Sequence, residues 1–190
     1  MKASFLNSPK SFLLIMPLIL GIAGCSTPNA TATKAAAKVS GQLSDGEILQ
    51  VVHAINGGEI QHAHLALEKS SRAEVKNTAQ MIIRDHTSLD DQVIGAGIEL
   101  QDTTLSKGVQ MQAEQVRKEL AELSGQEFEC KFLEKQIKLH QVALDTVRKE
   151  LKPDAQDEKV RQVVAKAEPS LERHLKEAQK HKDAMGGCAG

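Results

Sequence analysis

Four ionisable residues lie on otherwise apolar helical stripes of this sequence and are its candidates for chemistry. Aliphatic residues recur before and after each of them at the helical period, which predicts that each faces a helical core. Burying a charge or an unpaired polar group costs several kcal/mol, so each of them needs a partner. The partners can be one another or a transition-metal ion, since imidazole and carboxylate groups bind zinc, iron and copper. The candidates are Glu59, His86, His140 and His174.

The spacing of these candidates argues against an oxygen-activating di-iron centre. Such centres in helical bundles take a carboxylate three residues before a histidine from each of two helices. The residues three before the candidate histidines are aliphatic instead: Ile83, Ile137 and Leu171. A mononuclear site formed by the histidines with Glu59 remains open, as does a polar network that holds no metal and fixes helix register. No catalytic residue is assigned, and the same spacing disfavours a metal-dependent enzyme.

Apolar periodicity predicts the helices that must position the candidates. Four long helices are expected over about 45–69, 72–100, 126–151 and 155–184, with a shorter one near 106–122. Short links make the first pair and the last pair antiparallel hairpins, whereas the link of about 25 residues between the pairs can run the length of the bundle. The prediction is an all-α, ferritin-like four-helix bundle whose long crossover contains a short extra helix.

Helix levels and boundaries follow from the same pattern. If the second and third long helices run parallel, His86 and His140 lie at similar depth, whereas His174 falls several residues away in level. Pro153 is expected to separate the last two helices, and Pro169 to kink the last one. Three capping boxes mark expected helix starts: Ser44–Glu47, Ser71–Glu74 and Ser124–Glu127.

Residues 1–24 have the pattern of a secretory signal peptide. Lys2 and Lys10 precede an apolar run over 12–23, which is shorter than the roughly 20 residues that a spanning helix needs. Cys25 follows small residues and resembles the lipobox cysteine of bacterial lipoproteins, whose thiol is lipidated and becomes the first residue of the mature protein. A plain cleaved signal is the alternative.

The rest of the chain divides into a tether, one domain and a tail. Residues 25–43 are rich in alanine, threonine and serine and are expected to form a flexible tether behind the lipidated cysteine. Residues 44–185 suffice for one domain, and 186–190 are expected to be a flexible tail. Ser26 resembles an outer-membrane sorting signal if the cell is Gram-negative. The expected protein is exported and periplasmic, with the membrane as its partner through an N-terminal lipid and no protein partner indicated.

Composition and charge argue against a nucleic-acid partner. The chain has a formal net charge of −1, no tryptophan, no tyrosine and four phenylalanines. It therefore lacks both the basic face and the aromatic stacking platform that nucleic-acid binding uses.

Two further cysteines, Cys130 and Cys188, lie at helix ends that meet if the last two long helices form an antiparallel hairpin. The exported compartment is oxidising, so a disulfide between them is expected to tie the tail to the bundle. Two free thiols remain the alternative. Neither cysteine is accompanied by a histidine-based nucleophile motif.

Several segments together resemble a known family. They are Ala73–Lys76, Met81–His86, Ser124–Glu129, His140 and Pro169–Leu175. Their order and spacing resemble the bacterial ferritin-like family called domain of unknown function 4142, whose members are often labelled outer membrane proteins. The resemblance covers residues 44–183. The chain departs from the family at Leu139, where an acidic residue is usual, and at Glu129, where aspartate is common.

The resemblance implies a ferritin-like fold, export and no established activity, and it groups Glu59 with the three histidines as a site without an agreed role. Together with the signal sequence, it favours a membrane-tethered lipoprotein that is non-catalytic and has a structural or interaction role in the cell envelope or in stress tolerance. The alternative is a metal-binding protein that uses Glu59 and the histidines in the bundle core.

Overall fold

Helices make up all the regular structure in the part of the chain that the computed structural model describes, residues 41–186 and 188. The expected signal peptide, Cys25 and most of the expected tether lie outside these residues. Within them, no helix is both long enough and apolar enough to cross a membrane. The predicted all-α class is confirmed.

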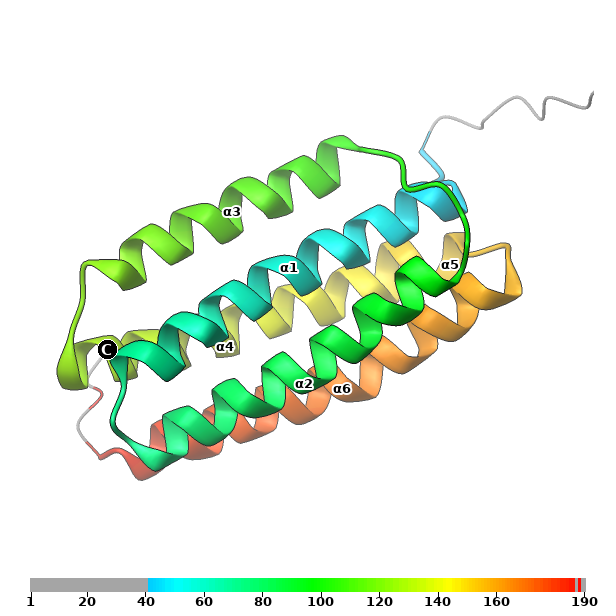
Figure 1. Ribbon diagram of the computed structural model, residues 1–190. Coiled ribbons are helices and arrows are strands. Elements are labelled where there is room, and N and C mark those ends of the chain that lie inside the picture. Colours follow the sequence, from blue (N-terminus) through cyan, green and yellow to red (C-terminus); the bar gives the residue numbers. More distant parts are fainter. Residues whose placement is uncertain (1–40, 187, 189–190) are drawn as a thin grey trace, which may run out of the picture. The chain divides into compact units, whose positions relative to one another are not determined.

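Five helices of 18 residues or more lie side by side (Figure 1). They are α1 (Asp45–Lys69), α2 (Ala73–Gly95), α3 (Thr104–Ala121), α4 (Gly125–Thr146) and α6 (Glu158–Ala184). After α4 the chain continues through a π-helical turn, η1 (Val147–Leu151), and the short α5 (Lys152–Asp154) before it turns back.

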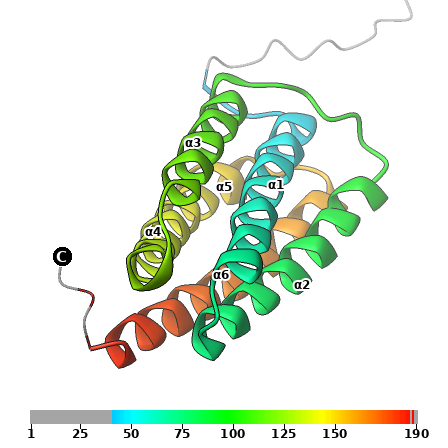
Figure 2. The same ribbon diagram turned by 60° about the vertical axis from the view of Figure 1, so that its left-hand side comes forward.

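The long helices alternate in direction, so α2 and α4 run the same way, and α3, which lies between them in the sequence, runs the opposite way (Figure 1). α1 packs against α2 and α3, α4 packs against α6, and α2 packs against α6. α3 lies alongside α1 in both views (Figures 1 and 2). The predicted crossover between the second and third long helices of the bundle is therefore α3 with its flanking links.

A polar layer crosses the bundle and divides the apolar core into two clusters. One cluster contains Val52 and Val147, and the other contains Val75 and Phe132. Along each of α1, α2, α4 and α6, the polar residues lie between the members of the two clusters. The buried side chains of this polar layer are Asn56, Glu59, His62, His86, Gln136, His140 and His174.

The start of α1 has the capping box that the sequence predicts. The amide of Glu47 donates to Ser44 Oγ at 3.3 Å, and the amide of Ser44 donates to a Glu47 carboxylate oxygen at 2.7 Å. The box predicted at Ser71 is wrong, because the residue that precedes α2 is Arg72 and its side chain binds Glu129 of α4 at 2.9 Å.

The box predicted at Ser124 is also wrong. The first residue of α4, Gly125, has a φ of +54°, outside the right-handed conformation that the box requires. Ser124 accordingly makes no side-chain capping hydrogen bond within the described residues. A box that the sequence analysis missed starts α3, where the Ser106 amide donates to Thr103 Oγ1 at 2.8 Å and the Thr103 amide donates to Ser106 Oγ at 2.9 Å.

Two helix ends differ from the prediction. α2 ends at Gly95 rather than near residue 100, and Gly97, with a φ of +70°, turns the chain toward α3. Pro153 does not end the helix before it, because it lies within α5, which follows η1 without a break. The helical path therefore continues to Asp154, and α6 likewise continues through Pro169.

A disulfide bond joins Cys130 in α4 to Cys188 beyond the end of α6, with Cα atoms 5.3 Å apart. α4 and α6 are antiparallel neighbours, which brings the start of one beside the end of the other (Figure 1). The bond therefore holds the chain beyond α6 against the start of α4.

Candidate metal centre

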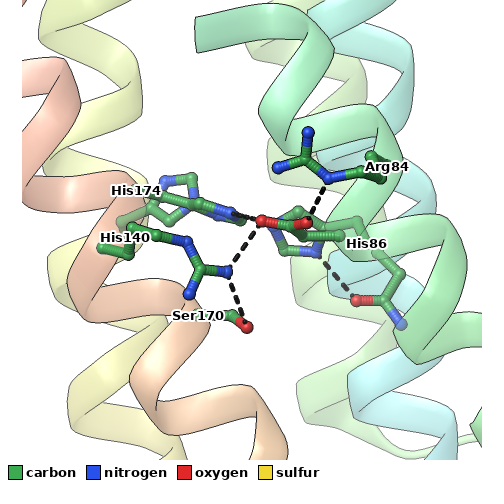
Figure 3. Close-up of polar contacts among 8 residues, drawn as sticks. Arg84, His86, His140, Ser170 and His174 are labelled. Atoms are coloured by element: carbon green, nitrogen blue, oxygen red, sulfur yellow. Dashed lines mark hydrogen bonds and ion pairs between the residues drawn. The ribbon is translucent and has the colours of Figure 1, made fainter.

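Three buried histidines meet in the polar layer from three different helices (Figure 3). His86 comes from α2, His140 from α4 and His174 from α6, and their exposed fractions are 2%, 1% and 1%. One ring nitrogen from each residue lies within 4.8 Å of those of the other two. The ring centroids of His140 and His174 are 5.1 Å apart, as are those of His86 and His174.

His86 and His140 each point one ring nitrogen at a fixed oxygen. His86 Nδ1 donates to Asn56 Oδ1 at 2.9 Å, and His140 Nδ1 donates to the Gln136 carbonyl at 2.9 Å. The Asn56 amide nitrogen donates to Asp90 at 3.3 Å, which fixes the end of the amide that faces the histidine. Because these oxygens only accept, each neutral histidine carries its proton on Nδ1 and a lone pair on Nε2.

His174 is held by the carboxylate of Asp85, to which its Nε2 donates at 2.9 Å. Arg84 Nε and Arg173 Nη2 donate to the same carboxylate at 2.9 and 2.8 Å. Burial acts to raise the pKa of Asp85, but the hydrogen bonds from His174, Arg173 and Arg84 outweigh it and lower the pKa to about 2. Asp85 is therefore a carboxylate at neutral pH, and it leaves the lone pair of a neutral His174 on Nδ1.

The remaining ring nitrogens turn three lone pairs toward one another. His140 Nε2 and His174 Nδ1 are 3.0 Å apart, and His86 Nε2 is buried without a hydrogen-bond partner among the described residues. Two lone pairs at 3.0 Å repel each other unless a proton or a metal ion lies between them. Burial disfavours the proton, because it lowers the pKa of His140 to about 3 and also lowers that of His174 despite the hydrogen bond to Asp85.

The spacing of these nitrogens suits a metal ion. Zinc–nitrogen bonds of about 2.0–2.1 Å place two ligands of a tetrahedral site roughly 3.3 Å apart. His140 Nε2 and His174 Nδ1 are close to that separation. The ring nitrogen of His86 would have to move toward them by at most on the order of 1.5 Å. The other ring nitrogens donate to an amide oxygen, a backbone carbonyl and a carboxylate, and contacts of this kind fix the orientation of metal-ligating histidines.

Glu59 belongs to the polar layer but is not part of the group of three within the described residues. Burial raises the pKa of Glu59 to about 7, and the neighbouring Gln136 side chain partly offsets that rise. His62, three residues later on α1, donates from Nε2 to the Ala113 carbonyl of α3 at 2.8 Å. The role of Glu59 as a metal ligand stays a prediction.

Asp85, Asn56 and the Gln136 carbonyl complete the surroundings of the three histidines, and the sequence analysis did not identify them as site residues. Asn56 and Gln136 follow the apolar period of their helices, so their burial is visible in the sequence. The signal for Asp85 is that it directly precedes His86 within Met81–His86, one of the segments that carry the family resemblance. Its contact with His174 joins α2 to α6 and is visible only in the fold.

Comparison with protein families identifies the family of this chain. A family model described as "Domain of unknown function (DUF4142)" matches residues 28–180. No curated protein and no solved structure matches the chain. The matched residues include the whole polar layer and Asp85, and the description of the family assigns no activity to them. The chain belongs to the DUF4142 family.

Proposed function

We propose that this protein holds a divalent transition-metal ion between His86, His140 and His174. The observation that carries the proposal is the convergence of three buried ring nitrogens, each oriented by a hydrogen bond on the far side of its ring. Neutral imidazoles bind zinc, copper, iron and nickel. Three protein ligands leave a further coordination position for water or for another ligand.

A polar network without a metal accounts less well for the same geometry. In such a network each buried donor and acceptor has a partner. His86 Nε2 has none within residues 41–186 and 188, and His140 and His174 oppose two lone pairs. A buried acceptor left unpaired costs about 1–3 kcal/mol. A cation would satisfy all three nitrogens at once, with Asp85 supplying compensating negative charge through His174.

Calorimetric titration of the purified, chelator-treated protein with Zn²⁺ tests the proposal. We expect saturable binding of one ion per chain, and an increase of about 2.7 kcal/mol in the free energy of unfolding when free zinc is 100 times its dissociation constant. Co²⁺ in the same site should give a visible absorption band that zinc displaces. If none of Zn²⁺, Co²⁺, Ni²⁺ and Cu²⁺ binds at this stoichiometry, the three histidines form a polar network instead.

We further propose that the bundle is exported and tethered to a membrane by lipid on Cys25. The support is the short apolar run followed by small residues and this cysteine. Intact-mass measurement of the protein isolated from a bacterial membrane fraction is expected to show a chain that begins at Cys25 and carries acyl groups. A mature chain that begins elsewhere, or an unmodified Cys25, would rule the tether out.

A further inference from the structure

A cavity of about 50 Å³ lies between α1, α3 and α4, outside the group of three histidines. Most of its lining is aliphatic and includes Ile55, Val109 and Leu139. Glu59 and His62, one helical turn apart on α1, contribute its buried polar lining. The cavity therefore combines an apolar wall with two buried groups that can form hydrogen bonds.

Both polar groups present an atom that lacks a partner. Glu59 Oε2 and His62 Nδ1 make no hydrogen bond within the described residues, although Glu59 is only 6% exposed and His62 only 1%. His62 Nε2 donates to the Ala113 carbonyl, so Nδ1 of the neutral ring carries a lone pair. Buried groups of this kind are normally paired, which indicates that something else completes the site.

The chemistry of these two atoms selects the ligand. An anion would face two lone pairs, a hydrocarbon would leave both unpaired, and an alcohol has a single hydrogen to donate. A water molecule has two hydrogens to donate but no charge to pair with the carboxylate. A primary ammonium group has three N–H donors and a positive charge that pairs with a carboxylate. We propose that the cavity binds a short primary alkylamine, with its ammonium group on Glu59 and His62 and its alkyl chain along the aliphatic wall.

The charges around the cavity permit a cation. Arg117 and Lys135 lie near His62, but each is paired with a glutamate, at 2.8 and 2.5 Å respectively. Burial raises the pKa of Glu59 to about 7; the Gln136 side chain lowers it only partly, and no charged counter-ion among the described residues lowers it further. An ammonium group in the cavity would supply that counter-ion.

The volume of the cavity limits the size of the ligand. At about 50 Å³ the cavity exceeds the space that one water needs, so it suits a small ligand such as propylamine. A longer chain would leave the cavity past Val142, whose side chain is 48% exposed.

Titration of the full-length protein with propylamine at pH 8, followed through amide chemical shifts, tests this proposal. Propan-1-ol and propionate serve as probes of the same size without an ammonium group. We expect saturable shifts in α1, α3 and α4 around the cavity with propylamine, and binding at least about tenfold weaker with the other two. Glu59→Gln should weaken propylamine binding about tenfold or more, whereas Glu68→Gln, at an exposed position of α1, should leave it unchanged.

The unaltered protein alone can decide the question. Absence of saturable propylamine binding, or equal binding of propan-1-ol, would mean that solvent alone fills the cavity and would overturn the proposal. If Glu59→Gln does not fold, Val142→Trp, which places a ring over the solvent side of the cavity, should weaken propylamine binding instead. Zinc-loaded and zinc-free protein should bind the amine alike, since neither cavity residue belongs to the group of three histidines.

Discussion

Replacing His140 with alanine is expected to lower the affinity for zinc by more than about 100-fold. A change that only disturbs the orientation of a ligand costs about 10–100-fold, and the loss of a ligand costs more. His140 supplies one of three converging nitrogens, and its ring also faces His174 at 3.0 Å. Competition with a chromophoric chelator at pH 7.5 measures the change in affinity, and far-ultraviolet circular dichroism reports whether the variant keeps its helices.

Two comparison variants turn this prediction into a graded series. Asp85→Asn keeps all three nitrogens but loses the charge that His174 Nε2 binds, and it should lower zinc affinity by about 10–100-fold. His64→Ala changes an exposed histidine of α1 and should have no effect. Zinc affinity that is the same in His140→Ala and the unchanged protein would show that the ion, if bound, lies elsewhere.

Replacing Glu59 with glutamine is expected to stabilise the protein at neutral pH. Burial raises the pKa of Glu59 from 4.5 to about 7 in the folded protein. Between these values the folded chain binds a proton that the unfolded chain has lost, so this carboxyl makes stability fall as pH rises through the window. The glutamine variant escapes that loss and should gain on the order of 3 kcal/mol in unfolding free energy, relative to the unchanged protein, between pH 4.5 and 8.

The difference between the two proteins isolates this carboxyl from the buried histidines. The pKa values of His62, His86, His140 and His174 are lowered mainly by burial, which makes stability rise with pH up to about 6.5, their value in the unfolded chain. That slope is common to both proteins and cancels in the difference. Urea unfolding in the presence of a chelator measures the difference in unfolding free energy between the two proteins at each pH, with Glu68→Gln as the exposed control. A difference that stays constant from pH 4.5 to 8 would contradict the burial of an ionisable Glu59.

Apolar periodicity predicted the helices well because it reports burial directly. α1 was predicted at its observed bounds, and α6 begins three residues later than expected and ends where expected. The starts of α2 and α4 lie within a residue of their expected positions, but the capping boxes predicted there are wrong. A serine followed three residues later by glutamate does not show what else competes for the surrounding groups. Before α2 that competitor is Glu129 of α4, which binds Arg72. Only the packing of α4 beside the start of α2 reveals it.

The level of His174 could not be predicted for a related reason. Sequence analysis placed it several residues away from His140, yet His140 Nε2 and His174 Nδ1 are 3.0 Å apart. The helical path of α4 does not end at Leu151 but continues through α5 to Asp154, and the two histidines lie at similar distances from the turn into α6. A π-helical turn adds residues to a helix without changing its apolar pattern enough to be seen in the sequence.

Glu59 shows a different limit of sequence reasoning. It shares the apolar stripe of α1 with residues that face the core, which is why it was grouped with the histidines. In the fold α3 packs along α1, and the cavity that Glu59 lines is formed with α3 and α4. A stripe shows that a residue is buried, but tertiary packing decides which neighbour buries it.

The division of the core by the polar layer has a consequence for partial unfolding. The two apolar clusters share α1, α2, α4 and α6, so neither cluster can loosen without disturbing helices that also run through the other. Fraying that begins at either end of the bundle reaches the histidines before it reaches the apolar cluster beyond them. An ion held there would raise the free energy of sub-global opening as well as that of complete denaturation, and would join the two halves into one cooperative unit.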